Sequence, residues 1–436
     1  MSWWRGVYSA ALALLTPLAF ARLAWKGRSN LDYRARWGER LGFVSTFPVK
    51  PRLWIHAVSV GEVIAATPLI RTWQTQHPDW AILVTTTTPT GSAQLRRSFG
   101  ESVEHVYLPY DLPGAVRRFY ARTQPTRGVI METELWPNLF AEAKRRGVPL
   151  LLANARLSEK SMRGYAKLRG LVAETLACLN LIAARDAQDV ARFIALGALP
   201  DKVEALGNLK FDLDIAPGVR ERGQAWRAQF GAERWVWIAA STHPGEDEQV
   251  LQAHRKVQEQ RPDALLLLAP RHPERTDELA RLIQAQGFAF ERRSNLNVGA
   301  NSFAHPSLGI PHVRMNSHLP ESATVVLIDT LGELMDFYAA SDVAFVGGSL
   351  VPHGGHNPLE PLALGLPVIS GEAVFNFAEI YAAMQAEALV IWAHDAESLA
   401  TSALAALGMP KSPRGLDFLS QHRGAVARLL ARMEEY

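Results

Sequence analysis

The sequence of 436 residues contains a single cysteine, Cys178. One cysteine cannot form an intramolecular disulfide or a cysteine-rich zinc site, and this composition is typical of a reducing compartment. Neither sign of charge is in large excess, because the sequence has 46 basic and 43 acidic residues. A net charge of +3 does not favour a nucleic-acid partner, but it suits acidic substrates or an anionic membrane face.

Three widespread catalytic signatures are missing: the phosphate loop Gly-x-x-x-x-Gly-Lys-Ser/Thr, the zinc motif His-Glu-x-x-His and the nucleophile elbow Gly-x-Ser-x-Gly. Candidate metal ligands are also few. Asp212 and Asp214 form Asp-x-Asp, but they lie in an expected linker, where we expect them to be solvated. His353 and His356 are three residues apart with no third ligand in view. We expect neither a metal nor a cofactor.

The N-terminus carries an apolar, uncharged run at residues 6–21, with tryptophans on both sides as in an interfacial belt. Sixteen residues are short for a span, and Ala19 to Ala21 would suit signal-peptidase cleavage, so export is the alternative. Positive charge resists translocation, and five basic residues follow: Arg22, Lys26, Arg28, Arg34 and Arg36. We expect residues 1–25 to be an uncleaved, single-pass anchor with the catalytic body in the cytoplasm.

After this segment, short β-rich runs alternate with helical patterns, which predicts doubly wound parallel sheets. The runs lie at 53–58, 81–85, 128–131, 149–153, 179–184, 203–206, 236–240, 264–268, 324–328, 343–346 and 366–369. The length exceeds that of a single core, so we expect two domains, 26–215 and 216–436, joined by a linker near 212–220. Residues 291–322 lack periodicity and are expected to form a polar surface insertion.

The second half holds the strongest candidate for a nucleotide site. Glycine pairs at 347–348 and 354–355 follow a buried run and precede an apolar helix. Asn357 can cap this helix, Pro358 suits its first turn, and Glu360 stands where a capping-box acid would. Backbone N–H groups left free at such a turn suit a phosphate, and an early acid can bind two sugar hydroxyls. An ordinary capped helix would explain Asn357 and Pro358, but not four glycines around two histidines.

Other strand ends also carry chemical groups, and ligands of such sheets bind there. Glu62 follows the first run at a helix start, where the helix dipole is expected to keep it ionised, as suits a general base. A plain N-terminal helix acid explains Glu62 equally well. Glu132 is one of two acids that end another strand, and Lys210 lies just before the linker. Arg271 follows a leucine-rich run and suits a phosphate, and residues 241–246 form a further expected anion loop.

Seven segments of the chain, taken together, resemble the 3-deoxy-D-manno-octulosonic acid (Kdo) transferases of lipopolysaccharide synthesis. They are 36–42 (RWGERLG), 59–62 (SVGE), 132–138 (ETELWPN), 154–158 (NARLS), 207–212 (GNLKFD), 270–272 (PRH) and 354–361 (GGHNPLEP). The strings ELWPN and GGHNPLEP are specific to the family, whereas Ser-x-Gly-Glu alone is not. The segments occur in the family order, and the 291–322 insertion is the main departure.

The resemblance implies an α/β glycosyltransferase of the GT-B fold, with two Rossmann-like doubly wound domains facing a cleft, an N-terminal membrane-anchor helix and no metal. It implies inverting transfer of Kdo from CMP-Kdo, bound by the C-terminal domain, to a lipid A precursor (lipid IVA), bound by the N-terminal domain, at the inner membrane. By position, Glu62 is the catalytic base, and Glu132 and Lys210 assist it. The residues implied to hold CMP are Pro270, Arg271, Leu331, Gly332, Glu333, Asn357, Pro358, Leu359 and Glu360.

Two other classes of protein stay open. A different GT-B-type nucleotide-sugar enzyme, such as an epimerase or another glycosyltransferase, would share the fold and the C-terminal loop. It would need neither an anchor nor the ELWPN string. A non-catalytic, membrane-tethered binding protein would keep the fold but have no use for Glu62.

Overall fold

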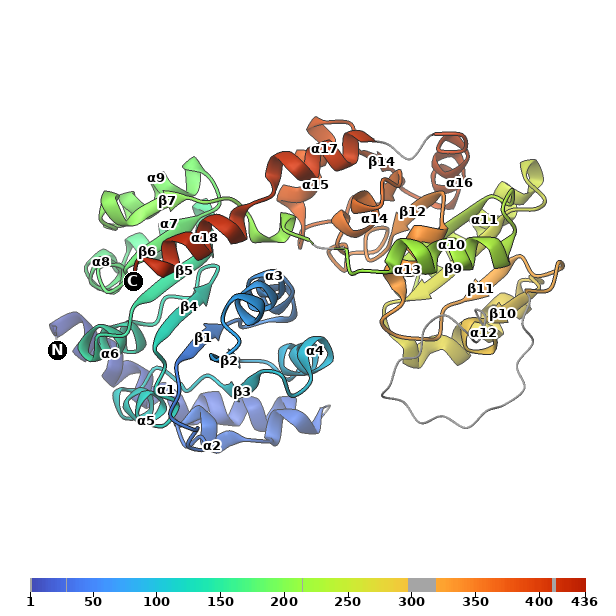
Figure 1. Ribbon diagram of the computed structural model, residues 1–436. Coiled ribbons are helices and arrows are strands. Elements are labelled where there is room, and N and C mark those ends of the chain that lie inside the picture. The colour runs from blue at the N-terminus through green and yellow to red at the C-terminus, as the bar shows by residue number, and fades with distance from the viewer. Residues whose placement is uncertain (1, 29, 214, 297–318, 410–412) are drawn as a thin grey trace. The chain divides into compact units, whose positions relative to one another are not determined.

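The computed structural model describes residues 2–28, 30–213, 215–296, 319–409 and 413–436. They belong to two compact units, Met1–Asp212 with His422–Tyr436, and Leu213–Gln421 (Figure 1). Each unit is built on a parallel sheet of seven strands with helices on both faces. The expected fold class is therefore confirmed. The boundary at Asp212 and Leu213 lies inside the segment predicted to be the linker.

The sheet of the first unit has the order β3-β2-β1-β4-β5-β6-β7. Its strands are β1 (Arg52–His56), β2 (Ala81–Thr86), β3 (Glu104–Tyr107), β4 (Arg127–Met131), β5 (Leu150–Ala155), β6 (Leu181–Ala184) and β7 (Val203–Ala205). The chain winds outwards from β1 in one direction and from β4 in the other. The gap between the ends of β1 and β4 is thus the topological switch point, where such sheets bind ligands.

Helices of the first unit cover both faces of this sheet. They are α1 (Trp3–Lys26), η1 (Leu31–Arg34), α2 (Trp37–Arg40), α3 (Val60–Gln76), α4 (Pro89–Phe99), α5 (Pro113–Thr123), α6 (Pro137–Arg146), α7 (Glu159–Ala166), α8 (Arg169–Leu176), α9 (Ala187–Ala195), η2 (Pro200–Lys202), η3 (Leu209–Phe211) and α18 (Ala425–Glu434). Side chains alternate along each strand, so Leu53 and Ile55 of β1 pack with α3 and α18, and Trp54 packs with α5.

The last helix, α18, belongs to the first unit, although we expected it in the second domain because it follows that domain in the sequence (Figure 1). Its apolar face, which includes Leu429 and Met433, is buried in the same cluster as α3. Asp212 accepts hydrogen bonds from the backbone N–H groups of Gly424 and Val426 at the start of this helix. Asp212 is therefore a helix cap rather than the solvated residue that we expected, and Asp214 lies outside the described residues.

The sheet of the second unit has the order β10-β11-β9-β8-β12-β13-β14. Its strands are β8 (Val236–Thr242), β9 (Leu265–Pro270), β10 (Phe290–Arg292), β11 (Val325–Leu327), β12 (Val343–Val346), β13 (Val368–Ser370) and β14 (Val390–Trp392). Its helices are α10 (Val219–Phe230), α11 (Asp247–Gln260), η4 (Pro273–Arg275), α12 (Thr276–Ala285), η5 (Arg293–Asn295), α13 (Leu334–Ala340), α14 (Leu359–Ala363), α15 (Ala378–Ala386), α16 (Ala396–Ala405) and α17 (Pro413–His422). Here the switch point lies between β8 and β12.

The expected insertion at 291–322 is partly regular. Its first residues belong to β10 and η5, because Phe290–Arg292 pairs in parallel with Val325–Leu327. The expectation of a surface loop throughout was therefore wrong for this part. Residues 297–318 lie outside the described residues.

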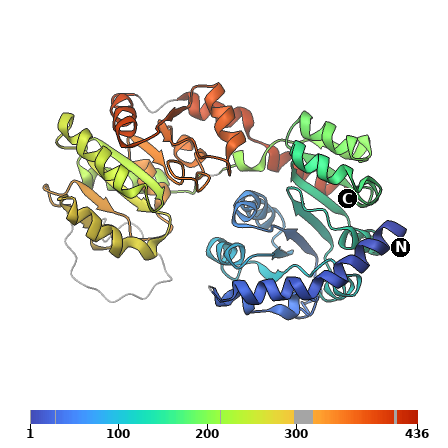
Figure 2. The ribbon, with the colours of Figure 1, turned by 180° about the vertical axis from the view of Figure 1, so that it is seen from behind.

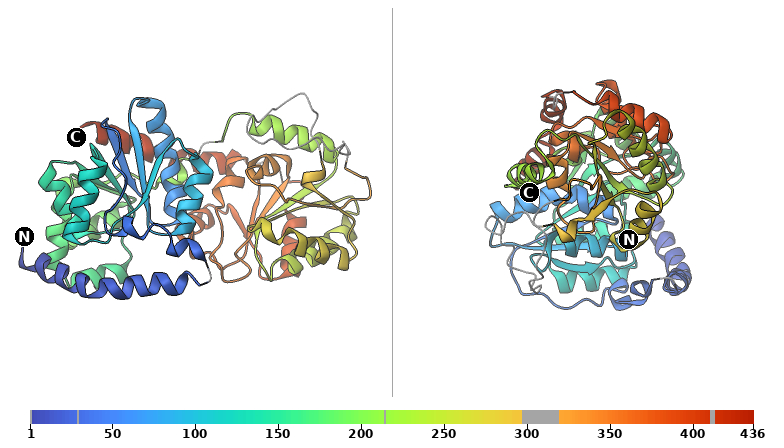
Figure 3. Two further views of the ribbon diagram at one scale, coloured as in Figure 1. Left: turned by 90° about the horizontal axis from the view of Figure 1, so that it is seen from below. Right: turned by 90° about the vertical axis from the view of Figure 1, so that its right-hand side faces the viewer.

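Helix α1 is longer than the apolar run that predicted it, with 24 residues. By length and composition it could cross a membrane, with a mean hydropathy of 1.5 over its best window. It lies along one side of the first unit, as the dark blue helix of Figure 2 and of the left panel of Figure 3 shows. The ring of Phe20 packs there against those of Trp37 and Tyr110, at centroid distances of 5.3 and 5.4 Å.

Candidate functional site

Glu62 lies in the first turn of α3, at the switch point of the first sheet, and only 9% of it is exposed. One carboxylate oxygen accepts the N–H of Val58 at 2.7 Å, and the other accepts the hydroxyl of Ser59 at 3.3 Å. Burial raises the pKa of Glu62 to about 8, and the charges of Glu132 and Glu134 add to this effect. The helix dipole was expected to keep Glu62 ionised, whereas burial beside two acids favours its protonated form.

Glu132 follows β4, on the other side of the same switch point. Its backbone is left-handed, with φ of 57°, and its side chain is buried. Lys210 approaches one carboxylate oxygen at 3.3 Å, and Arg156 approaches the other at 2.9 Å. The carboxylate is thus held between two cations, so this edge of the sheet carries positive as well as negative charge.

Two residues of this site were missed as individual candidates. Arg156 pairs with Glu132, and Asn154 accepts the backbone N–H of Leu209 at 3.1 Å. The second contact fixes η3, which carries Lys210. The available signal was the segment 154–158, which we read only as part of a family resemblance.

The glycine loop after β12 differs from its expected role. The N–H groups of Gly348, Ser349 and Leu350 all donate to the carboxylate of Glu246, at 2.6 to 2.9 Å. The N–H of His243 donates to the same carboxylate at 3.0 Å. These N–H groups are therefore not available to a phosphate, because a fully buried acid from the segment that we expected to bind anions already occupies them.

Imidazole rings gather at the carboxyl ends of β8, β9 and β12. The Nε2 atoms of His243 and His356 are 2.9 Å apart, and the ring of His353 stacks on that of His243 at 4.1 Å. The ring of His272 lies 5.6 Å from His243, edge to face. The pKa of His243 is lowered to about 4 and that of His356 to about 3, mainly by burial and also by the neighbouring histidines and Arg271. The hydrogen-bonded pair is therefore neutral at physiological pH.

The start of α14 carries part of the expected donor site, Asn357 to Glu360. The side-chain oxygen of Asn357 accepts the N–H of Leu359 at 3.1 Å, and its amide donates to Glu360 at 3.2 Å. Burial raises the pKa of Glu360, whereas Asn357 and the charge of Arg271 oppose this effect. The backbone N–H of Arg271 donates to the carbonyl of Thr242, which joins the ends of β9 and β8.

The turn Leu331 to Glu333 lies after β11, at the same edge of the second sheet. Gly332 has a φ of 88°, and Leu331 is exposed. The carboxylate of Glu333 is held by Arg293 at 2.6 Å and by the hydroxyl of Thr330 at 2.5 Å. Its charge is therefore already paired.

The structure thus brings Glu62, Glu132 and Lys210 together in the first unit, and Arg271 and Glu360 together in the second. No cluster of three His, Cys, Asp or Glu side chains within the described ranges has the geometry of a metal site.

Comparison with known proteins gives the family of this fold. Residues 35–213 match the family described as 3-Deoxy-D-manno-octulosonic-acid transferase (kdotransferase). The chain is 40% identical to 3-deoxy-D-manno-octulosonic acid transferase of Haemophilus influenzae and 38% identical to that of Bordetella pertussis, with 99% of each chain covered in both cases. A probable mitochondrial enzyme of the same description from Arabidopsis thaliana is 34% identical, over 87% of this chain and 82% of that protein.

Similarity to solved structures supports only the fold of the chain. A UDP-GlcNAc 2-epimerase from Neisseria meningitidis has a TM-score of 0.54 at 13% identity, and the match covers 88% of this chain and all of that one. A putative UDP-N-acetylglucosamine 2-epimerase from Listeria monocytogenes has a TM-score of 0.53 at 16% identity, with 88% and 96% covered. At such identities the likeness extends to the fold and not to the reaction.

Proposed function

This chain belongs to the 3-deoxy-D-manno-octulosonic acid (Kdo) transferase family, and we propose that it transfers Kdo from CMP-Kdo to the lipid A precursor lipid IVA, inverting the configuration and using no metal. The observation that carries this proposal is the buried carboxyl of Glu62, with a pKa of about 8, beside the ion pair of Glu132 and Lys210. A general base is most effective when its pKa lies near the working pH.

In the proposed reaction, the Glu62 carboxylate takes the proton of an acceptor hydroxyl while that oxygen bonds to the anomeric carbon of Kdo. The bond from this carbon to the phosphate oxygen breaks on the opposite face, and CMP leaves with the bonding electrons as a phosphate monoester. Bond formation opposite the leaving group inverts the configuration. The proton on Glu62 then passes to solvent.

Glu132 and Lys210 assist this step in the proposal without transferring the proton. Because Glu132 lies between Lys210 and Arg156, it fixes both cations in place. Fixed cations stabilise negative charge that develops in a transition state, because they need no reorganisation when the charge appears. The carboxylate of Kdo and the phosphate of the leaving group are the charges that they would meet.

The proposed CMP site lies in the second unit and comprises Pro270, Arg271, the turn 331–333 and residues 357–360. Arg271 supplies positive charge for the phosphate, and Glu360 suits the ribose hydroxyls. Since Glu246 occupies the N–H groups of residues 348–350, the phosphate must depend on Arg271 and residues 357–360 rather than on the first glycine pair.

Metal independence and membrane location complete the proposal. Asp212 caps α18, which removes it from the candidate metal ligands. The apolar helix α1 supports attachment to the inner membrane, with the basic residues after it favouring a cytoplasmic catalytic body.

The transfer itself is tested by incubating the detergent-solubilised protein with CMP-Kdo and lipid IVA, with and without a chelator. We expect the lipid to gain the mass of Kdo, CMP to be released, and the rate to survive chelation. Glu62→Gln should lower turnover by roughly 10²–10⁴-fold, since it removes the base, while CMP still binds. Glu221→Gln serves as the control, because Glu221 is an exposed acid in the first turn of α10.

Each outcome separates one part of the proposal from the others. Normal turnover by Glu62→Gln would leave Glu62 as a helix acid without a catalytic role. Release of CMP without a Kdo-bearing lipid product would contradict the proposal that lipid IVA is the acceptor. A strict need for a divalent cation would contradict metal independence.

A further inference from the structure

Helix α1 has its polarity reversed relative to a helix on the surface of a soluble domain. Every residue of Trp3–Ala21 that is exposed is apolar: Trp3, Trp4, Val7, Ala10, Ala11, Ala13, Leu14, Leu15, Pro17, Leu18 and Ala21. Its polar side chains from Arg5 to Thr16 are half-buried or buried. A surface helix normally turns its apolar stripe towards the core and its polar face to water. An exposed apolar face of this kind requires a partner.

The inward polar face of α1 is tied to the first unit by specific contacts. Ser9 and Asn138 exchange hydrogen bonds at 2.9 and 3.2 Å, and both are buried. Tyr8 donates a hydrogen bond to Asp111, which also accepts the N–H groups of Asn138 and Leu139 at the start of α6. These contacts fix which face of α1 points outward.

Both halves of α1 are also held against the first unit. At the N-terminal end, Ser2 donates a hydrogen bond to Glu174, and Arg5 approaches the same carboxylate at 3.5 Å. Towards the other end, the ring of Phe20 packs against those of Trp37 and Tyr110. The helix is therefore held against the first unit from Ser2 to Phe20.

A membrane-spanning orientation would break these contacts. Arg5, Tyr8 and Ser9 would enter hydrocarbon, where an unpaired polar group is expensive, and Asp111 and Asn138 would lose their partners inside the domain. In an orientation parallel to the bilayer, only the apolar outward face enters the lipid and every polar contact is kept.

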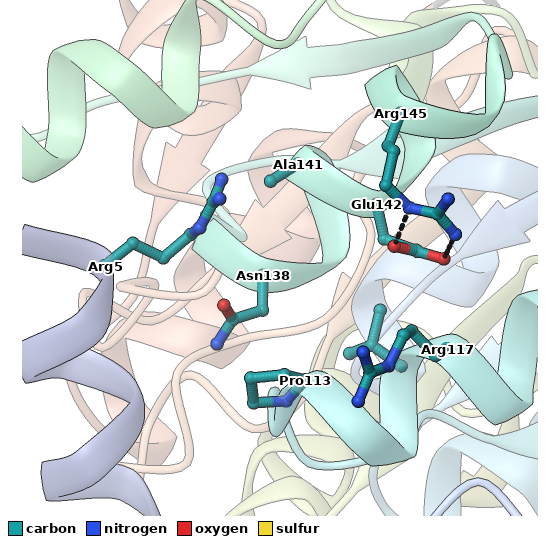
Figure 4. A pocket seen from close by; sticks show the side chains of 8 residues that line it. Arg5, Pro113, Arg117, Asn138, Ala141, Glu142 and Arg145 are labelled. Carbon is teal, nitrogen blue, oxygen red and sulfur yellow. Dashed lines mark hydrogen bonds and ion pairs between the residues drawn. The ribbon is translucent and has the colours of Figure 1, made fainter. Parts of the chain in front are cut away.

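Positive charge lies near both ends of α1. Arg22 and Arg28 are exposed near the C-terminal end of α1. Beside its N-terminal half is a pocket of about 510 Å³, lined by Arg5, Arg117 and Arg145 together with Asn138 and Glu142 (Figure 4). Glu142 is bound by Arg145 at 2.6 Å, so the arginines exceed the acid in the lining. Anionic headgroups suit basic groups beside a membrane-bound helix.

We propose that α1 does not cross the membrane but lies in the plane of an anionic bilayer surface, with its outward face at the boundary between headgroups and acyl chains. The polar face stays bound to the first unit, which brings this unit onto the lipid. The proposal replaces the single-pass anchor expected from the sequence. It rests on the proposed membrane location, but it needs neither donor nor acceptor to be tested.

Depth measurement in vesicles distinguishes the two orientations. In full-length protein carrying Cys178→Ser, a fluorophore is attached to Leu14→Cys on the outward face or to Thr16→Cys on the inward face. Vesicles of phosphatidylcholine and phosphatidylglycerol carry nitroxides either near the headgroup or at the chain end. An in-plane helix is buried by only about 5–10 Å, so the shallow nitroxide should quench the Leu14→Cys label more strongly. The Thr16→Cys label should be quenched little by either.

Binding to the same vesicles gives an independent measure. Leu14→Glu should bind at least about tenfold more weakly than the unmodified protein, because it places a charge in the lipid-facing side. Leu199→Glu, at an exposed leucine remote in sequence from α1, is the matched control and should bind normally. Pure phosphatidylcholine should be bound roughly a hundredfold more weakly than the anionic mixture. Circular dichroism and CMP binding check that each variant folds.

These experiments distinguish a failure of the in-plane orientation from a failure of the proposed membrane location. Stronger quenching of the Leu14→Cys label by the deep nitroxide would mean that α1 spans the bilayer, and this would overturn the in-plane orientation alone. Normal vesicle binding by Leu14→Glu would also overturn it. Absence of vesicle binding by the unmodified protein would overturn the proposed membrane location as well, while transferase activity in detergent would stand or fall separately.

Discussion

The carboxyl group of Glu62 makes the proposed reaction depend on pH. Only its ionised form can accept a proton, and burial raises its pKa to about 8. The value of kcat/KM should therefore rise as pH increases through about 8, and fall below it as Glu62 becomes protonated. Initial rates at low donor concentration, between about pH 6 and about pH 10, measure this profile. A profile that is flat near 8 would contradict the role of Glu62 as base.

Arg271 should distinguish a nucleotide from a nucleoside. Arg271→Ala should weaken CMP binding by roughly 1.5–3 kcal/mol, the value of a charged hydrogen bond, and should reduce the salt dependence of binding. Cytidine, which has no phosphate, should bind the variant almost as it binds the unmodified protein. Titration calorimetry at two salt concentrations measures both ligands, with Arg281→Ala on the exposed face of α12 as control. Equal affinity of the unmodified protein for CMP and cytidine would contradict a phosphate site.

At this scale, the sequence identified residues whose position follows from local structure. Glu62 could be chosen because a strand end and a helix start place it at the edge of a sheet. Its pKa could not be predicted, since it depends on burial beside Glu132 and Glu134, which follow a different strand. The role of Glu246 was hidden for the same reason, because its partner Gly348 is 102 positions away.

At the scale of elements, the loop between β12 and α14 depends on one carboxylate. Glu246→Ala would leave the N–H groups of Gly348, Ser349 and Leu350 without their acceptor in the interior. We expect the free energy of unfolding to fall by at least about 3 kcal/mol and CMP binding to weaken, because the loop leads into the proposed donor site. Denaturant unfolding and CMP titration measure the two effects.

Glu246→Gln provides the matched comparison for this loop. It retains one oxygen acceptor, so its loss of stability should be smaller than that of Glu246→Ala. If both variants were as stable as the unmodified protein, the carboxylate would not hold the loop.

The strands that sequence patterns missed are all at sheet edges. They are β3, β10 and β14, whereas the interior strands of both sheets were predicted. An interior strand of a parallel sheet is buried on both faces and reads as a continuous apolar run. Residues of β10 and β14 are only half-buried, so their sequences carry no such run.

At the scale of the whole molecule, the first unit is assembled from two separate segments and the second from one. Residues 213–421 expressed alone should therefore fold. Residues 1–212 alone should be unstable, because the apolar face of α18, including Leu429 and Met433, is missing from their core. Joining 422–436 to 1–212 through a flexible linker should restore a cooperative thermal transition. Equal melting temperatures with and without 422–436 would show that α18 is dispensable.

The length of the chain predicted two domains, but it could not predict that the C-terminal helix packs on the first one. The apolar stripe of α18 shows that it must cover a core and does not reveal which core. The decision rests on long-range contacts, such as the cap that Asp212 forms on Gly424.

The return of α18 sets an order of events during synthesis. About 200 residues of the second unit are translated between Asp212 and His422, which takes roughly 10–40 s at 5–20 residues per second. Throughout this interval the sheet face that α18 covers is exposed on the nascent chain, and α1 has already been made. The ribosome thus presents a lipid-binding helix on a domain whose core closes only when the last residues emerge. Premature termination within 422–436 would therefore damage the part of the protein that was translated first.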